Sequence, residues 1–179
     1  MLRIQNCNIF GFQTGVLFRP LAVAKLFIEN TTISENDTGI TIVPAPFGMS
    51  PTGRGGADVS VNKIRVQNNT AGILVDGGFG HIKMAMQDSE VSGNTKNGIH
   101  AKTTNHPVRV TADRIMSVNN DVGILSEGAR ARVTLNYSMI TGNRANLAKI
   151  SRGALESYKT NSIDDDTPGE TGLLIVPIH

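Results

Sequence analysis

Aliphatic residues recur along this chain in a pattern that repeats about every 25 residues. The stretch VSVNKIRVQNNTAGI, residues 59–73, shows one copy: an aliphatic pair, a short polar break, another aliphatic residue, an Asn, and then Gly-Ile. The Gly aligns the copies, and Asn146-Leu147 forms a degenerate one, since Asn adopts positive φ more readily than most residues. The aligned glycines, at steps of 24, 33, 26 and 25 residues, are Gly15, Gly39, Gly72, Gly98 and Gly123, and Asn146 follows after 23.

Two further columns of like residues precede the glycines. An Asn stands three residues before most of them, and four before Gly98, which indicates a one-residue insertion there; these are Asn36, Asn69, Asn94, Asn120 and Asn143. Aliphatic residues precede each Asn, with Ser117 and Ala112 as exceptions; they are Ile9, Ile33, Val66, Val91 and Ile140, and before them Ile4, Ile28, Val61, Met86 and Leu135. Each copy therefore predicts three short strands with period-2 alternation.

A unit of this size cannot bury its own apolar face, so successive units must stack. A period in the twenties with three short strands predicts a parallel β-helix, and the Leu spacing of the rival leucine-rich repeat is missing. Equivalent strands of successive coils would then pair about 4.8 Å apart. We expect the aligned Asn side chains to form a ladder of hydrogen bonds along the axis.

The repeat covers the chain as one domain, residues 1–179, with two departures. Residues 44–57, PAPFGMSPTGRGGA, contain three prolines and four glycines and predict an inserted loop. Residues from about 164 to 179 predict a C-terminal edge segment after a partial seventh coil. The first residues, MLRIQNCNIF, enter the repeat at once, without the apolar core of a signal peptide or a capping segment. We therefore expect a fragment of a longer protein; the alternative is that the fold tolerates an open edge.

Composition narrows the function classes. The net charge is only +2 and both signs are mixed, which gives no nucleic-acid footprint. The apolar runs are far shorter than the roughly 20 residues of a membrane span. Cys7 is the only cysteine, so no disulfide can form within the chain.

The N-x-x-G-I coils, together with the terminal GALESYKTNSI, resemble the right-handed parallel β-helix proteins of bacteria, the pectate-lyase-like superfamily. Within it, the chain is similar to a group of uncharacterised β-helix-repeat proteins that end in a Ser-Tyr-x-x-Asn coil, here Ser157, Tyr158 and Asn161. The resemblance implies an all-β, right-handed parallel β-helix of about six full coils, and an exported protein. Superfamily members include polysaccharide lyases, glycoside hydrolases, esterases, adhesins and phage tailspikes, so fold alone does not select a function.

One column of the repeat carries candidate chemistry. After the first strand of each coil come Asn6, Asn30, Lys63, Asp88, Arg114 and Tyr137. Lys63, Asp88 and Arg114 would be neighbours on successive coils, as candidates for a lyase-like or sugar-binding site. The alternative is a ladder of alternating charge whose exposed pairs stabilise by about 0–1 kcal/mol each.

Binding candidates lie in three places. Tyr137 continues that column, Arg54 lies in the predicted loop, and His100 stands in an outward strand position where it could stack on a sugar or pair with a carboxylate. Ordinary surface positions are the alternative for each. No pair of histidines has metal-ligand spacing, so we expect neither a metal nor a cofactor.

The outward column of Leu17, Leu74 and Leu125 is apolar for an exposed strand, so we expect self-association through this face or through the open N-terminal edge. We expect the protein itself to be a non-catalytic β-helix module, structural or carbohydrate-binding, with polysaccharide as its partner class. The alternative is a polysaccharide lyase or glycoside hydrolase.

Overall fold

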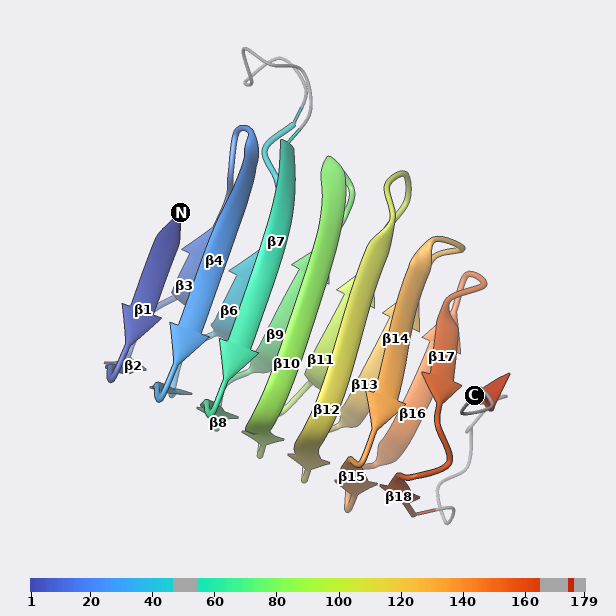
Figure 1. Ribbon diagram of the computed structural model, residues 1–179. Coiled ribbons are helices and arrows are strands. Elements are labelled where there is room, and N and C mark those ends of the chain that lie inside the picture. The colour runs from blue at the N-terminus through green and yellow to red at the C-terminus, as the bar shows by residue number, and fades with distance from the viewer. Residues whose placement is uncertain (47–54, 165–173, 176–179) are drawn as a thin grey trace.

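The alternating aliphatic residues build a solenoid of parallel strands. The computed structural model describes residues 1–46, 55–164 and 174–175, and these residues form strands and no helix. Each coil has a long first strand, a short second strand and a third strand that returns behind the first (Figure 1). Every pairing between coils is parallel, so the backbone groups of each coil are satisfied by its neighbours. Six full coils and a partial seventh confirm the prediction.

The strands fall into three sets. The first strands are β1 (Leu2–Gln5), β4 (Val23–Glu29), β7 (Gly55–Asn62), β10 (Gly80–Ser92), β12 (Val108–Val118), β14 (Ala131–Asn136) and β17 (Ala154–Ser157). The short second strands are β2 (Asn8–Phe10), β5 (Thr32–Ser34), β8 (Arg65–Gln67), β15 (Met139–Thr141) and β18 (Ser162–Ile163), while β10 and β12 run on through this position themselves. The third strands are β3 (Thr14–Phe18), β6 (Thr38–Ile42), β9 (Ala71–Asp76), β11 (Asn97–Lys102), β13 (Val122–Glu127) and β16 (Ala145–Ile150).

The predicted aliphatic columns lie in register and fill the lumen. Ile28, for example, pairs with Val61, which pairs with Met86, and all three are at most 1% exposed. The two exceptions in these columns, Ala112 and Ser117, are also fully buried. A narrow core built from layers of branched side chains accounts for the absence of Trp from the sequence.

The Asn column forms the predicted ladder. From Asn69 to Asn143, each Oδ1 accepts hydrogen bonds from the backbone N and the Nδ2 of the Asn one coil earlier, at 2.8–3.1 Å. Asn36 Oδ1 accepts from the backbone N of Phe12 at 2.9 Å. Asn94 keeps its place in the ladder, so the extra residue of its coil lies between Asn94 and Gly98. Asn143 donates onward to Asn146, whose Nδ2 donates to the carbonyl oxygen of Asp164. The ladder thus fixes the same corner in every coil.

The predicted reason for the aligned glycines is wrong. None of them adopts positive φ, and neither does Asn146. A Cβ at Gly72 would lie 2.3 Å from the carbonyl oxygen of Gly98, and one at Gly39 would lie 2.6 Å from Cγ1 of Val66. Close approach of the next coil therefore requires glycine at these positions, and Asn146 can carry a side chain because it stands in the last full coil.

The two predicted departures lie partly outside the described residues. After β6, residues 43–46 lead into the undescribed range 47–54, and β7 begins at Gly55, within the range predicted for the loop. Of the edge segment, the structure describes Asp164 and β19 (Leu174–Ile175), which pairs with β17. The described residues contain no helix that is long and apolar enough to cross a membrane.

Candidate functional site

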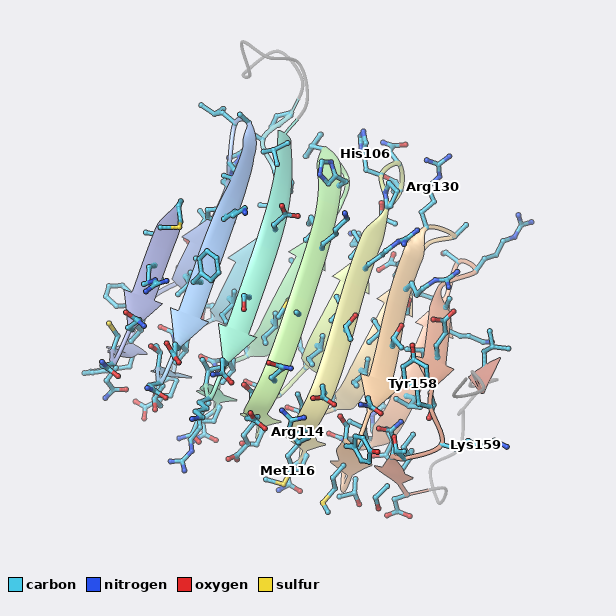
Figure 2. The ribbon with its side chains drawn as sticks, in the orientation of Figure 1. His106, Arg114, Met116, Arg130, Tyr158 and Lys159 are labelled. Carbon is cyan, nitrogen blue, oxygen red and sulfur yellow. The ribbon has the colours of Figure 1, made fainter. Side chains whose placement is uncertain are left out.

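A groove of about 680 Å3 follows the corner between the first and second strands across the coils. One wall is the predicted chemical column, from Asn30 through Lys63, Asp88 and Arg114 to Tyr137. The structure thus places four of the six site candidates in one groove. Figure 2 shows Arg114 at the lower corner of the molecule, near Met116 on the same strand, β12.

The wall column has an unusual backbone. Asn6, Asn30, Lys63, Asp88, Arg114 and Tyr137 all adopt positive φ, between 45° and 54°. This left-handed conformation turns the chain from the first strand into the second within one residue. It is uncommon for residues other than Gly, Asn and Asp.

Side-chain hydroxyls set the floor of the groove. Ser89 Oγ accepts a hydrogen bond from the backbone N of Ile64 at 3.2 Å and donates to the carbonyl oxygen of Gln87. Ser138 repeats this arrangement one pair of coils further on, accepting from the backbone N of Ile115 at 3.2 Å. The floor hydroxyls are therefore occupied by the fold, and ligand contacts must come from the walls.

The charged part of the wall is internally neutralised. Arg114 Nε donates to Asp88 Oδ1 at 2.7 Å, its Nη2 donates to Asp88 Oδ2 at 3.3 Å, and its Nη1 donates to Asp113. The hydrogen bond from Arg114 holds the pKa of Asp88 below its usual value, and the charge of Lys63 acts in the same direction. The same hydrogen bond raises the pKa of Arg114. This pairing belongs to both alternatives from the sequence, the charge ladder and the sugar-binding site.

The opposite wall comes from the short second strands and changes character along the groove. Arg65 and Glu90 lie 3.8 Å apart in the charged stretch. Further along, Met116 is 38% and Met139 45% exposed, facing the column that carries the 61% exposed Tyr137. Along the groove, the charged side chains of Lys63, Asp88 and Arg114 are therefore followed by an apolar stretch of Met116, Tyr137 and Met139.

The remaining candidates lie elsewhere. His100 is on β11, in the sheet behind the first strands, where its Nε2 is 2.9 Å from Oε2 of Glu127 and its Nδ1 is 3.4 Å from Nδ2 of Asn97. Burial lowers the pKa of His100, and the contact with Glu127 only partly opposes that effect. Arg54 lies outside the described residues.

A second, smaller cleft of about 410 Å3 lies on the outer face of β4, β7, β10 and β12. Lys25, Asp58, Lys83 and Arg109 occupy one column across it, in register from coil to coil. Lys83 and Arg109 are thus like charges on adjacent strands, which is an unfavourable pairing for stability. This charged column was not predicted from the sequence, although its residues stand at outward period-2 positions of the first strands.

The predicted apolar face is only partly exposed. Leu17 is 57% exposed, whereas Leu74 and Leu125 are intermediate in exposure. Exposed apolar residues gather instead on the first coil, which has neighbours on one side only; among them are Leu2, Phe10 and Phe12. Within the described residues, no three His, Cys, Asp or Glu side chains are grouped so as to hold a metal ion.

Comparison with known proteins addresses the fold. The family model described as "Right handed beta helix region" matches residues 1–115, which is more than half of the chain. Searches of the curated proteins and of the solved structures gave no match. The coils of Figure 1 continue beyond residue 115 in the same register as far as the pairing of β15 with β18. The chain belongs to the right-handed β-helix family.

Proposed function

We propose that this protein is a non-catalytic, carbohydrate-binding β-helix module that holds a polysaccharide in the corner groove. The observation that carries the proposal is the groove itself, which runs along the axis past several coils and is lined by polar, charged and aromatic side chains. A linear polymer fits a groove of this shape, because it can contact equivalent positions on successive coils. Ligand sites commonly combine apolar or aromatic contacts with a few polar groups in this way.

The pairing of the charged residues argues against catalysis in this groove. A polysaccharide lyase needs a base that removes a proton from the carbon beside a carboxylate. Arg114 donates to two carboxylates and its pKa is raised, so it holds its proton more firmly. A glycoside hydrolase needs a protonated carboxylic acid. Asp88 cannot supply it near neutral pH, because its pKa is lowered.

The alternative is a polysaccharide lyase, and one observation favours it. Lys63, Asp88 and Arg114 do lie together in a groove. Because carboxylates hold Arg114, a lyase in this groove would use Lys63 as its base. The groove lies at the carboxyl end of β7, whereas the inserted loop rejoins the chain at the amino end of that strand. The loop end described here is thus separated from the groove by the length of β7.

A polysaccharide panel with and without Ca2+ separates the two functions. Binding is measured by retardation in native gels that contain each polysaccharide, and lyase action by the ultraviolet absorbance of unsaturated products. We expect retardation without product. Product that disappears in a Lys63→Ala variant would establish the lyase instead, and neither retardation nor product would leave a structural module.

A further inference from the structure

The two corners of each coil differ in a way that points to the ligand. Both corners need one residue with positive φ per coil. At the corner beside the Asn ladder these residues are Gly or Asn in five coils of six, with one exception; they are Gly11, Glu35, Asn68, Gly93, Asn119 and Gly142. These residue types adopt the left-handed conformation at least cost. The ladder corner is thus occupied by the residues that suit its backbone.

The groove corner departs from that rule where the groove is best formed. Its first two coils carry Asn6 and Asn30, but the next four carry Lys63, Asp88, Arg114 and Tyr137, of which only Asp88 is a type that adopts this backbone readily. Lys, Arg and Tyr gain nothing from a left-handed backbone, and residues held in such conformations cluster at functional sites. Tyr137 in particular is 61% exposed and no side-chain hydrogen bond explains its presence. We therefore infer that the residue types of this column serve contacts with a ligand and not the backbone conformation.

The charges of the groove cancel locally. Lys63, Arg65 and Arg114 face the carboxylates of Asp88, Glu90 and Asp113. A groove of this kind attracts neither polyanions nor polycations over distance. Its paired charges instead offer donors and acceptors in fixed directions, which suits hydroxyl groups.

We propose that the ligand is an uncharged polysaccharide that lies along the coil axis, with one sugar ring stacked on Tyr137. The apolar stretch formed by Met116, Tyr137 and Met139 takes the C–H face of the ring, and the Arg114–Asp88 pair hydrogen-bonds to hydroxyl groups of neighbouring units. An exposed tyrosine with an apolar body and a polar tip suits such a ligand. This inference rests on the carbohydrate-binding function proposed above, and adds the charge class of the ligand and the residue that anchors it.

The competing ligand is a polyanion, and the surface with two adjacent cations to receive it is the second cleft, although Asp58 also lies beside Lys83 there. Lys83 and Arg109 stand side by side on the outer face of β10 and β12, where a linear anion would relieve their repulsion. Binding there would depend on salt, because exposed charges are screened. Binding of an uncharged chain at Tyr137 would not.

The test uses the full chain and native affinity gels at low and high NaCl. The uncharged probes are hydroxyethylcellulose, galactomannan and arabinan, and the anionic probes are polygalacturonate and alginate. We expect retardation by an uncharged probe that salt does not reduce. Tyr137→Ala should weaken it about tenfold, equivalent to about 1.4 kcal/mol, and Tyr137→Phe should retain it. Phe79→Ala, which removes an exposed ring from the turn before β10 and outside the groove, is the control.

The outcomes separate the two levels of the proposal. Retardation by anionic probes alone, lost in high salt or in Arg109→Ala, would overturn the uncharged ligand while leaving carbohydrate binding in place. Retardation by no probe would overturn both. Tyr137→Asn guards against a folding artefact, because Asn suits the positive φ of 45° and the variant should fold at least as stably. Wild-type retardation in both Tyr137→Asn and Tyr137→Ala would overturn the role of the tyrosine ring.

Discussion

The Asn ladder makes a quantitative prediction about stability. Asn94 is 1% exposed and lies in the middle of the ladder. Its Oδ1 accepts from the backbone N and the Nδ2 of Asn69, both at 3.1 Å, and its Nδ2 donates to the carbonyl oxygen of Val66 at 3.2 Å and to Asn120 Oδ1 at 2.8 Å. Asn94→Ala removes all four hydrogen bonds and leaves the backbone N–H of Asn69 buried without this acceptor.

Four hydrogen bonds at about 1 kcal/mol each predict a loss of about 4 kcal/mol in the free energy of unfolding. This is a large part of the 5–15 kcal/mol typical of natural domains. Equilibrium urea unfolding, followed by circular dichroism, measures the loss. The control is Asn105→Ala, because Asn105 is exposed and its side chain makes one long bond, 3.4 Å, to the carbonyl oxygen of Gly78. We expect it to change stability by less than about 0.5 kcal/mol.

Asn94→Asp tests whether hydrogen-bond donors, and not only packing, are responsible. Asp has nearly the same shape but cannot donate to Val66 or Asn120 when ionised, so it buries a charge opposite two acceptor oxygens. We expect Asn94→Asp to be less stable than Asn94→Ala at neutral pH. A loss below about 1 kcal/mol for Asn94→Ala, equal to that of an ordinary surface change, would refute the ladder as a source of stability.

Three further predictions concern the groove corner, His100 and the first coil. Lys63→Asn should raise the free energy of unfolding by about 1 kcal/mol, because Asn adopts the positive φ of this position at lower cost than Lys. The reverse change, Asn30→Lys, should lower the free energy of unfolding by a similar amount. Urea unfolding measures both, and no change in either variant would contradict a cost of the positive φ. Burial lowers the pKa of His100 despite Glu127, so the folded protein binds this proton more weakly than the unfolded chain does. The contribution of His100 to stability is therefore present above the unfolded pKa near 6.5 and is lost as the pH falls below that value. Unfolding between pH 7 and pH 5 should therefore show less loss in His100→Gln, and an unchanged slope would assign the effect to other groups. The first coil exposes apolar side chains, and its described strands β1 and β2 each pair on one side only. Light scattering should therefore show a second copy of the chain binding there as the concentration rises. A strictly monomeric species would contradict this prediction.

The fold was readable from the sequence because its determinants are local and periodic. Ile28, Val61 and Met86 recur at equivalent places in their copies, and the stacking of coils then brings them into register. The Asn ladder follows from the same logic, because a fixed offset from each glycine becomes a fixed position on the axis. Even the insertion near Gly98 left Asn94 in line, since the ladder bonds hold that corner.

The groove was less readable because its shape depends on backbone angles. Lys63 and Arg114 carry no signal for positive φ, so the sharp turn at each could not be predicted from the residue type. The groove floor does correspond to a weak pattern in the sequence. Apolar and hydroxyl side chains alternate at the positions directly after the wall column, which are Ile64, Ser89, Ile115 and Ser138. The reason for the aligned glycines was also hidden, because a collision with the next coil depends on how closely the coils stack.

The two corners also allow one coil to combine stability with the proposed binding. The ladder corner is held by buried hydrogen bonds and by Gly or Asn at its turn, so changes there act on the whole stack. The groove corner lies on the far side of the short second strand, and its wall side chains point to solvent while the floor serine hydroxyls bond the backbone. Substitution of Lys63 or Tyr137 should therefore change binding and leave the register of the coils intact. Because the two corners are separate, the repetitive fold can present a row of different side chains at the groove corner without disturbing the ladder. A specific polysaccharide site requires such a row.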